Sequence, residues 1–443
     1  MKGPLPLLLI SLGATGLFEL FFHYDWDSGV VRGGLVVALL TLMLLAHGSS
    51  HTPVHPEQSR GRWPRWLLVA ASLGAGFLLY WHFKEGIIST VRQRRSEMGD
   101  IHVRAVKLLG HGVTPWRFGT VLESGALRFL IQAPEVVACR TLSVTPSEAA
   151  QAQLWESERR GSELFPERIN EPGCERGRSI LAVVGYRYGP AMLAAYVPLV
   201  SVLGRGGEYV THLVFLLAIL GAMAVLLRPL ALEGLVMACV IVLGQSVLRR
   251  DTLLDSDCDL IPTAMMLWAL VAFEKGRSLT AGALTGLTLA AKVFPAVFLL
   301  PLLLSRSVSR GRALAGCALV SLITWGPALA LDGVGVWDNV FRFNIERGGD
   351  STALAHFVPP LLMTLLRLII VAWCALAFYR LVLRPRAGPG EPLLFVAVCM
   401  GLFFLFTKVF HNNYVVWWLP VVGVTLARAL TAPRLTARSA ASS

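Results

Sequence analysis

The sequence is poor in charge. Of its 443 residues, 15% are charged and 55% are hydrophobic. Apolar runs of about 20 residues recur along most of the chain, which is the length that a helix needs to cross a bilayer. The pattern predicts a polytopic helical membrane protein, and disfavours the alternative of a soluble bundle of fully buried helices.

Signals for several other protein classes are missing. No Cys or His spacing fits a zinc site, and no basic patch alternates with aromatic residues. We therefore assign the formal charge of +12 to the bias of Lys and Arg toward cytoplasmic loops, and expect no nucleic-acid partner. No internal repeat is evident, which disfavours a secondary transporter. The N-terminal apolar run lacks a strongly basic start, so we expect a retained helix rather than a cleaved signal.

Ten apolar runs are predicted to span the membrane. Residues 1–63 hold two extra spans and a cytoplasmic loop, residues 64–430 form the core, and residues 431–443 form a cytoplasmic tail. The predicted spans are 4–22, 29–46, 66–83, 209–227, 230–248, 260–273, 313–331, 358–379, 393–406 and 414–430.

The basic residues of the short loops predict the orientation. If each span crosses once, these residues fall on one side, which we assign to the cytoplasm. The opposite side then holds the long loop 84–189, the acidic run before residue 260, the loop 332–356 and the turn 408–413. The orienting residues are Arg60, Arg62, Arg65, Lys275, Arg277, Arg306, Arg310, Arg312, Arg380, Arg384, Arg386, Arg428, Arg434 and Arg438.

The apolar block 279–304 has basic residues at both ends, so both ends should be cytoplasmic. Lys292 and Pro295 interrupt its middle. We predict a re-entrant hairpin of two short helices, because irregular backbone at membrane depth is tolerated only inside protein or beside a cavity.

The long loop 84–189 is predicted to contain short helices. Asp100 can cap a helix over residues 101–109 that Gly110 ends, with one apolar face suited to the membrane interface. A capping box at residues 145–148 starts a second helix, and the Pro-interrupted segment 186–204 returns at the outer interface. Cys139 and Cys174 share this loop, and whether they form a disulfide is left open.

Two groups of acids could carry chemistry. Asp100 is explained by helix capping alone, or it is a carboxylate that accepts a proton from a substrate hydroxyl. Asp255, Asp257 and Asp259 could hold magnesium or manganese, although a solvated loop with a helix cap is the favoured interpretation.

Basic and aromatic residues on the same side could bind an anionic sugar donor. Arg342 and Arg347 lie near two glycines, a pattern that suits phosphate but also ordinary charge pairs. Arg367 lies inside an apolar span and should face a cavity or an anionic partner. The turn 408–414 supplies donors for phosphate or sugar hydroxyls, and the following Trp417 and Trp418 suit interfacial anchors.

Several of these motifs resemble the GT-C superfamily of membrane glycosyltransferases, and glycosyltransferase family 87 in particular. The matching stretches are "GDIHVRAVKLLGHGVTPW", "YRYGPAMLAAYVPL", "AGALTGLTLAAKVFP", "ERGGDS" and "KVFHNNYVVW", from about Trp66 to the C-terminus. The late turn reads His-Asn-Asn where the family has Ser-Pro-Gln, and residues 141–179 are extra. The resemblance implies a GT-C-like transmembrane helix bundle.

The resemblance also implies a reaction. A hexose, in this family mannose, moves from a polyprenyl-phosphate donor to a hydroxyl of a lipid or glycan acceptor, with inversion and with Asp100 as general base. Phosphate would be bound by Arg347, Lys408, His411 and Arg342, and other substrate groups by Asn413, Tyr414, Tyr188 and Trp116. No metal or other cofactor is implied.

The same resemblance implies a location and leaves rivals open. It places the enzyme in the bacterial inner or plasma membrane, among membrane lipids of the cell envelope, with an extracytoplasmic active site. A membrane transporter, a flippase for lipid-linked sugars, or a GT-C enzyme with another sugar are the alternatives.

Overall fold

The computed structural model describes a defined part of the chain. The described residues are 65–92, 97–110, 112, 114–116, 120–123, 126–129, 186–228, 232–244, 248, 258–306, 308–346, 359–379, 383, 391–406 and 414–431. The two N-terminal spans, the helix expected after residue 145, the cysteines Cys139 and Cys174, and the C-terminal tail lie outside these residues.

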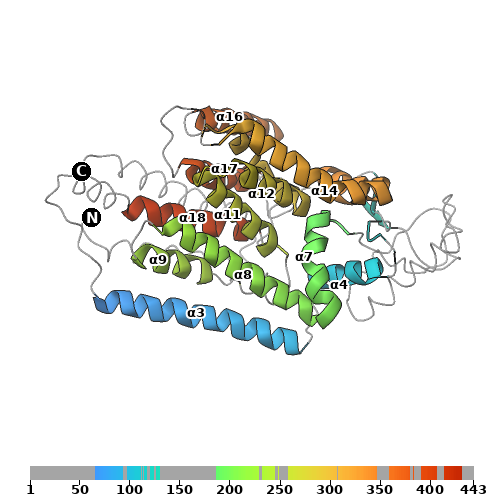
Figure 1. Cartoon of the computed structure of the whole chain (residues 1–443). Coiled ribbons are helices and arrows are strands. Elements are labelled where there is room, and N and C mark those ends of the chain that lie inside the picture. Colours follow the sequence, from blue (N-terminus) through green and yellow to red (C-terminus); the bar gives the residue numbers. More distant parts are fainter. Residues whose placement is uncertain are drawn as a thin grey trace, which may run out of the picture.

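The described chain is a bundle of helices whose long members run between two ends (Figure 1). All eight predicted spans within the described residues are helical. By length and hydropathy, α8 and α14 are the two described helices able to cross a membrane, and the others are shorter or less apolar. The helices that match predicted spans are α3 (Arg65–Val91), α8 (Gly206–Leu227), α9 (Leu232–Leu243), α11 (Leu260–Glu274), α14 (Arg310–Val336), α16 (Pro360–Phe378), α17 (Glu391–Phe406) and α18 (Val415–Thr431).

The outer helices turn large apolar side chains outward. Leu73 on α3 is 70% exposed, Leu322 on α14 is 70% exposed and Leu361 on α16 is 75% exposed, each with apolar neighbours on the same helix that are also exposed. A soluble protein rarely presents so much contiguous apolar surface to water. This surface, together with the apolar helices behind it, is that of a membrane protein.

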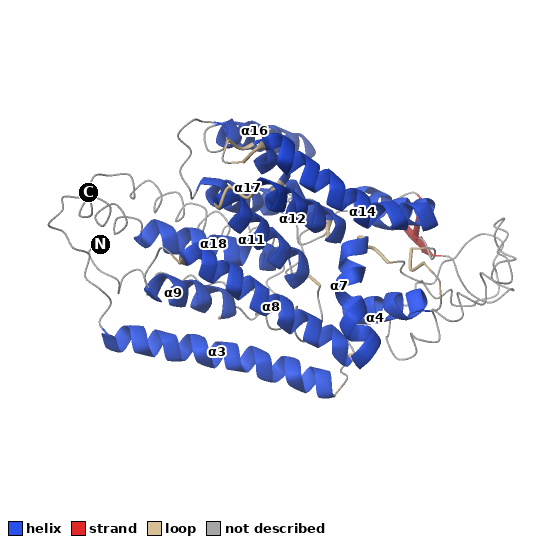
Figure 2. Ribbon diagram, in the orientation of Figure 1, coloured by secondary structure: helices blue, strands red, loops and turns tan. Residues whose placement is uncertain are grey.

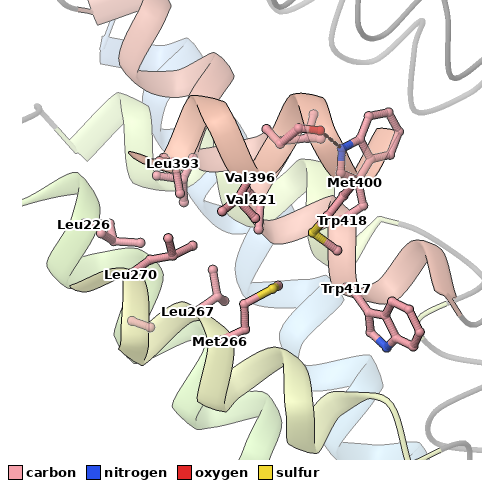
Figure 3. Close-up of a cluster of buried hydrophobic side chains, with 14 of the residues drawn as sticks. Leu226, Met266, Leu267, Leu270, Leu393, Val396, Met400, Trp417, Trp418 and Val421 are labelled. Carbon is pink, nitrogen blue, oxygen red and sulfur yellow. Dashed lines mark hydrogen bonds between the residues drawn. The ribbon is translucent and has the colours of Figure 1, made fainter. Parts of the chain in front are cut away.

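The core lies between α8, α9, α11, α17 and α18. Figure 3 shows Met266 and Leu267 of α11 on one side of the cluster, facing Val396 and Met400 of α17 and Val421 of α18. Trp417 and Trp418 are fully buried, and the indole of Trp418 donates to the carbonyl of Ala397 at 2.6 Å. The prediction that these tryptophans are interfacial anchors is therefore wrong, since both pack inside the bundle.

The block after α11 doubles back on itself. Helix α12 (Ser278–Ala291) runs away from the start of the block, and α13 (Val293–Val297) and η2 (Leu300–Leu304) bring the chain back. The amide of Ser309, just before α14, then donates to the hydroxyl of Ser278 at 2.7 Å. The chain path is that of the predicted helical hairpin, and its position in a membrane stays a prediction.

Glycines allow α12 and α14 to run parallel at very close range. A Cβ on Gly282 would stand 1.9 Å from the carbonyl oxygen of Ala313, and one on Gly286 would stand 2.6 Å from that of Cys317. The four-residue spacing of these glycines is the small-residue pattern that lets helix backbones approach in membranes. The contact fixes the course of α12, and Lys292 follows its C-terminal end.

Shorter elements gather at one end of the bundle, which we call the site end. They are α4 (Glu97–Gly110), α7 (Pro190–Leu203), the π-helical turn η3 (Trp337–Arg342) and α15 (Phe343–Glu346). Helix α7 lies at a steep angle to α8 and α14 there (Figure 1). An antiparallel pair of short strands, β1 (Thr120–Glu123) and β2 (Ala126–Phe129), lies at the same end (Figure 2). The otherwise helical fold agrees with the prediction, except for these strands, which the sequence did not indicate.

Candidate active site

Segments that are far apart in the sequence are tied together at the site end. The hydroxyl of Thr114 donates to Asp332 at 3.0 Å, and the amide of Asn339 donates to the carbonyl of Trp116 at 2.8 Å. The indole of Trp116 donates in turn to the carbonyl of Tyr188 at 2.9 Å. The described parts of the predicted outer loops therefore meet at one end, although the side of the membrane they face is untested.

Asp100 lies in the first turn of α4. The helix starts at Glu97, so the prediction that Asp100 is the N-cap is wrong. An acid in the first turn is still favoured by the positive end of the helix dipole. The side chain of Asp100 is outside the described part of the structure, so its role stays a prediction.

Helix α4 is enclosed by protein. The consecutive residues 101–106 are all buried, including His102 and Arg104, and only the C-terminal end of the helix shows clear exposure. The prediction of an interfacial helix with one apolar face is therefore wrong. Helix α7 and the segment around Trp116 cover the faces that the sequence pattern left open.

The imidazole of His102 anchors α4 in a cluster of tyrosines. Its ring stacks on Tyr196 with centroids 4.2 Å apart, and lies 4.8 Å from the ring of Tyr188. Its Nδ1 is 3.3 Å from the hydroxyl of Tyr186, and the hydroxyl of Tyr196 is 2.6 Å from Nε2 of His212. These contacts join α4, α7 and α8, and so fix the helix that bears Asp100.

Burial sets the charge of this cluster. Desolvation lowers the pKa of His102 well below 6.5, and the nearby His212 and Lys292 lower it further. Burial likewise raises the pKa of Tyr186 well above 10. His102 and Tyr186 are therefore neutral near pH 7, and stacking and hydrogen bonding hold α4 without an ion pair to His102.

A buried ion pair lies beside the tyrosines. Lys292 has extended backbone (φ −151°, ψ 124°) between α12 and α13, and its Nζ is 2.6 Å from Oδ1 of Asp259. The indole of Trp417 donates to the same oxygen at 2.7 Å. Asp259 is fully buried and its side chain makes no capping bond to α11, so the interpretation of this acid as a solvated helix cap is wrong.

Three aromatic rings surround the ammonium group of Lys292. Their centroids lie 4.8 Å (Trp417), 5.1 Å (Tyr414) and 5.7 Å (Tyr188) from Nζ. The rings of Tyr414 and Trp417 stack with centroids 4.5 Å apart. Ring faces attract cations, so the cage stabilises the charge of Lys292 while presenting flat apolar surfaces around it.

The model of glycosyltransferase family 87 matches residues 186–407, half of the chain. The chain belongs to glycosyltransferase family 87. No curated protein and no solved structure matches it. Membership of this family makes the protein a transferase that acts on a sugar donor and an acceptor.

The family 87 match covers only part of the cluster. Tyr188, Asp259 and Lys292 lie within it, whereas α4 with Asp100 precedes it and Tyr414 follows it. The match is shorter than the resemblance from Trp66 to the C-terminus that the motifs indicated. The spatial contacts, not the match, connect Asp100's helix and Tyr414 to the family core.

The structure brings together three of the predicted substrate-binding residues of this glycosyltransferase. Tyr188 and Tyr414 both face the ammonium group of Lys292, and Trp116 is hydrogen-bonded to Tyr188. Arg342 is half-buried in η3 at the same end. Four predicted residues lie outside the described part of the chain: Arg347, Lys408, His411 and Asn413. The roles of all eight remain predictions.

Sequence reasoning missed the centre of the cluster. From the sequence alone, we interpret Lys292 only as an interruption of the hairpin and as part of a motif, although a lysine within an apolar run is itself a signal of function. His102, His212 and Tyr196 carried no local signal. Conversely, Arg367 is exposed on α16, so the first alternative, that it faces a cavity, is wrong, and an anionic partner for it stays a prediction. Among the described residues, no group of three His, Cys, Asp or Glu could hold a metal ion.

Proposed function

We propose that this family 87 protein is an integral-membrane glycosyltransferase that uses a polyprenyl-phosphate sugar. It moves a hexose, for which the family resemblance suggests mannose, to a hydroxyl of a lipid or glycan acceptor. The observation that carries the proposal is the position of α4. His102 of α4 contacts the tyrosines beside Lys292, so the helix that bears Asp100 belongs to the same cation-and-aromatic cluster.

The proposed reaction is a single displacement with inversion. The acceptor oxygen attacks the anomeric carbon while its proton passes to the carboxylate of Asp100. The bond from that carbon to the phosphate oxygen breaks, and the electron pair leaves with polyprenyl phosphate. Because the phosphate gains one negative charge, the site needs cations rather than an acid at the leaving group. Arg342, Arg347, Lys408 and His411 are proposed for this task.

The aromatic residues and the outer surface suit the two halves of such a donor. Tyr188, Tyr414 and Trp116, with Asn413, are proposed to contact the sugar or the acceptor. The apolar outer faces of α3, α14 and α16 suit lipid, so the polyprenyl chain can stay in the bilayer. Following the distribution of basic loop residues, we propose that the reaction takes place on the extracytoplasmic side, and the family resemblance suggests a bacterial plasma membrane.

The test is transfer of radiolabelled mannose from polyprenyl-phosphate mannose by the purified protein. Asp100→Asn is expected to lower turnover about 100-fold or more, with donor binding retained. Glu97→Gln removes another acid from the same turn and serves as the matched control. Undiminished turnover by Asp100→Asn would refute the base assignment, and transport of lipid-linked sugar without any incorporation would refute the enzyme.

A further inference from the structure

The ammonium group of Lys292 has unused hydrogen-bonding capacity. It carries three N–H donors, and Asp259 accepts one of them. In the part of the chain that the structure describes, no second hydrogen bond to this nitrogen is found, and three aromatic rings lie near it with centroids 4.8 to 5.7 Å away. The lysine side chain retains 15% exposure, whereas Asp259 is fully enclosed. The member of the pair that a ligand can reach is therefore the lysine.

We propose that Lys292 binds the phosphate group of the donor, and that Asp259 is a competing internal anion that the phosphate displaces. The inference rests on the proposed function and adds a ligand for the phosphate to it. A phosphate ester joined to a sugar suits this surrounding, because the cation meets the anion while Tyr188, Tyr414 and Trp417 offer ring faces beside it.

Asp259 can stay in place when the phosphate binds to Lys292. Its Oδ1 keeps the hydrogen bond from the indole of Trp417 after Lys292 turns away. In the empty site the carboxylate neutralises the buried lysine, which would otherwise be costly. In the occupied site it repels the phosphate, and this repulsion grows when the departing phosphate gains charge. Asp259 is thus a positioning residue that promotes release of polyprenyl phosphate.

The proposal predicts an effect that a merely structural ion pair would not produce. Asp259→Asn keeps the shape and the acceptor for Trp417 but removes the competing charge. It is expected to tighten binding of polyprenyl phosphate roughly tenfold. A structural pair predicts the reverse, because loss of Asp259 would disorder the lysine and weaken binding.

The experiment measures binding of polyprenyl phosphate, without a sugar, to detergent-purified protein, with the ligand-free thermal stability of each variant as a reference. The double variant Asp259→Asn/Lys292→Met has no charge at either position, so the increase in affinity should disappear. It should bind polyprenyl phosphate roughly 100-fold less tightly than Asp259→Asn. Lys292→Arg retains a cation and should bind within about threefold of wild type. Lys275→Met, at the exposed far end of α11, is the matched lysine control and should not change binding.

Each outcome bears on one proposal or the other. The proposal is overturned if Asp259→Asn binds polyprenyl phosphate no more tightly than wild type. It is also overturned if the double variant binds as tightly as Asp259→Asn. If Asp259→Asn does not fold, retained affinity in a folded Lys292→Gln variant would overturn it. Comparable binding of inorganic phosphate would show a site for free phosphate instead of the donor lipid. If substitution of Lys292 weakens the binding of polyprenyl phosphate but the wild-type protein transfers no sugar, the phosphate site is supported and the proposed function is overturned.

Discussion

Two ion pairs lie near the opposite ends of α11 and differ in their surroundings. At the end of the bundle opposite the site end, which we call the far end, the guanidinium of Arg428 (α18) donates two hydrogen bonds of 2.5 and 2.6 Å to the carboxylate of Glu274. It also donates to the carbonyl of Leu226. At the site end, Lys292 makes a single bond to Asp259 within a cage of rings. The first pair uses the fork of an arginine to join three helices, whereas the second leaves donors unused.

This difference separates a structural pair from a functional one. A bidentate arginine pair with further bonds to the backbone has little left to offer a ligand. A lysine with one bond, a flexible stem and a partial opening to the outside can exchange its partner. If the comparison is right, variants at the far end should change stability alone, and variants at the site end should change donor binding as well.

The largest expected effect is at the far end. Arg428→Met leaves Glu274 partly buried without its partner, which should lower the free energy of unfolding by about 3–5 kcal/mol. Thermal unfolding in detergent measures the loss, and the KM for the donor in the surviving folded fraction should be unchanged. A rise in this KM with unaltered stability would contradict a purely structural role of the pair, because it would give Arg428 a role in binding.

The next effect tests how α12 carries Lys292 into the site. Gly282→Leu places side-chain atoms where the carbonyl of Ala313 approaches, and should cost about 1–3 kcal/mol of stability and weaken donor binding, since α12 must shift. Gly326→Leu is the matched control on α14, where nothing lies within 4 Å of a new Cβ. If the two leucine variants have equal stability and bind the donor equally well, the α12–α14 contact does not determine the position of Lys292.

The helices of this protein were largely predictable from its sequence. Long apolar runs specify spans whatever their partners are, and so α8, α14 and α16 begin and end within a few residues of the predicted bounds. The hairpin was predictable because Lys292 and the basic flanks are local signals. The faces of α4 were not, because burial of His102 depends on α7, which follows it about 90 residues later.

The centre of the candidate site depends on contacts that no local pattern encodes. Asp259 meets a lysine 33 residues later and an indole 158 residues later. In the sequence it appears as the last of three alternating acids, which is typical of a solvated loop. The resemblance predicts Tyr188, Tyr414 and Trp116, and the structure shows why they are near one another: the two tyrosines face the ammonium group of Lys292, and Trp116 is hydrogen-bonded to Tyr188.

A smaller effect should distinguish the adjacent tryptophans of α18. Trp417→Phe removes the hydrogen bond that holds Asp259 in place when Lys292 turns to the phosphate, so Asp259 should compete more strongly for the lysine and raise the KM for the donor. The rise should be up to about tenfold, because a bond to a charged group contributes about 1.5 kcal/mol. Trp418→Phe removes a bond to the carbonyl of Ala397 in the core and should lower only stability, by about 1 kcal/mol. Steady-state kinetics and thermal unfolding of both variants test this, and equal changes in KM would contradict it.

The smallest expected effect is an acid sensitivity confined to the site end. Burial lowers the pKa of His102 below 6.5, so the unfolded chain takes up a proton at this residue at a higher pH than the folded chain does. The stability from neutral His102 is therefore present above pH 6.5 and decreases as the pH falls below it, by at most about 1.4 kcal/mol per pH unit. Thermal unfolding of wild type and His102→Gln from pH 7.5 to 5.5 measures this difference. The variant should lose less stability across that range, whereas Trp418→Phe, which removes only a hydrogen bond to a backbone carbonyl, should keep the wild-type pH dependence. Identical slopes for wild type and His102→Gln would mean that protonation of His102 does not loosen α4, and would remove this distinction between the two ends.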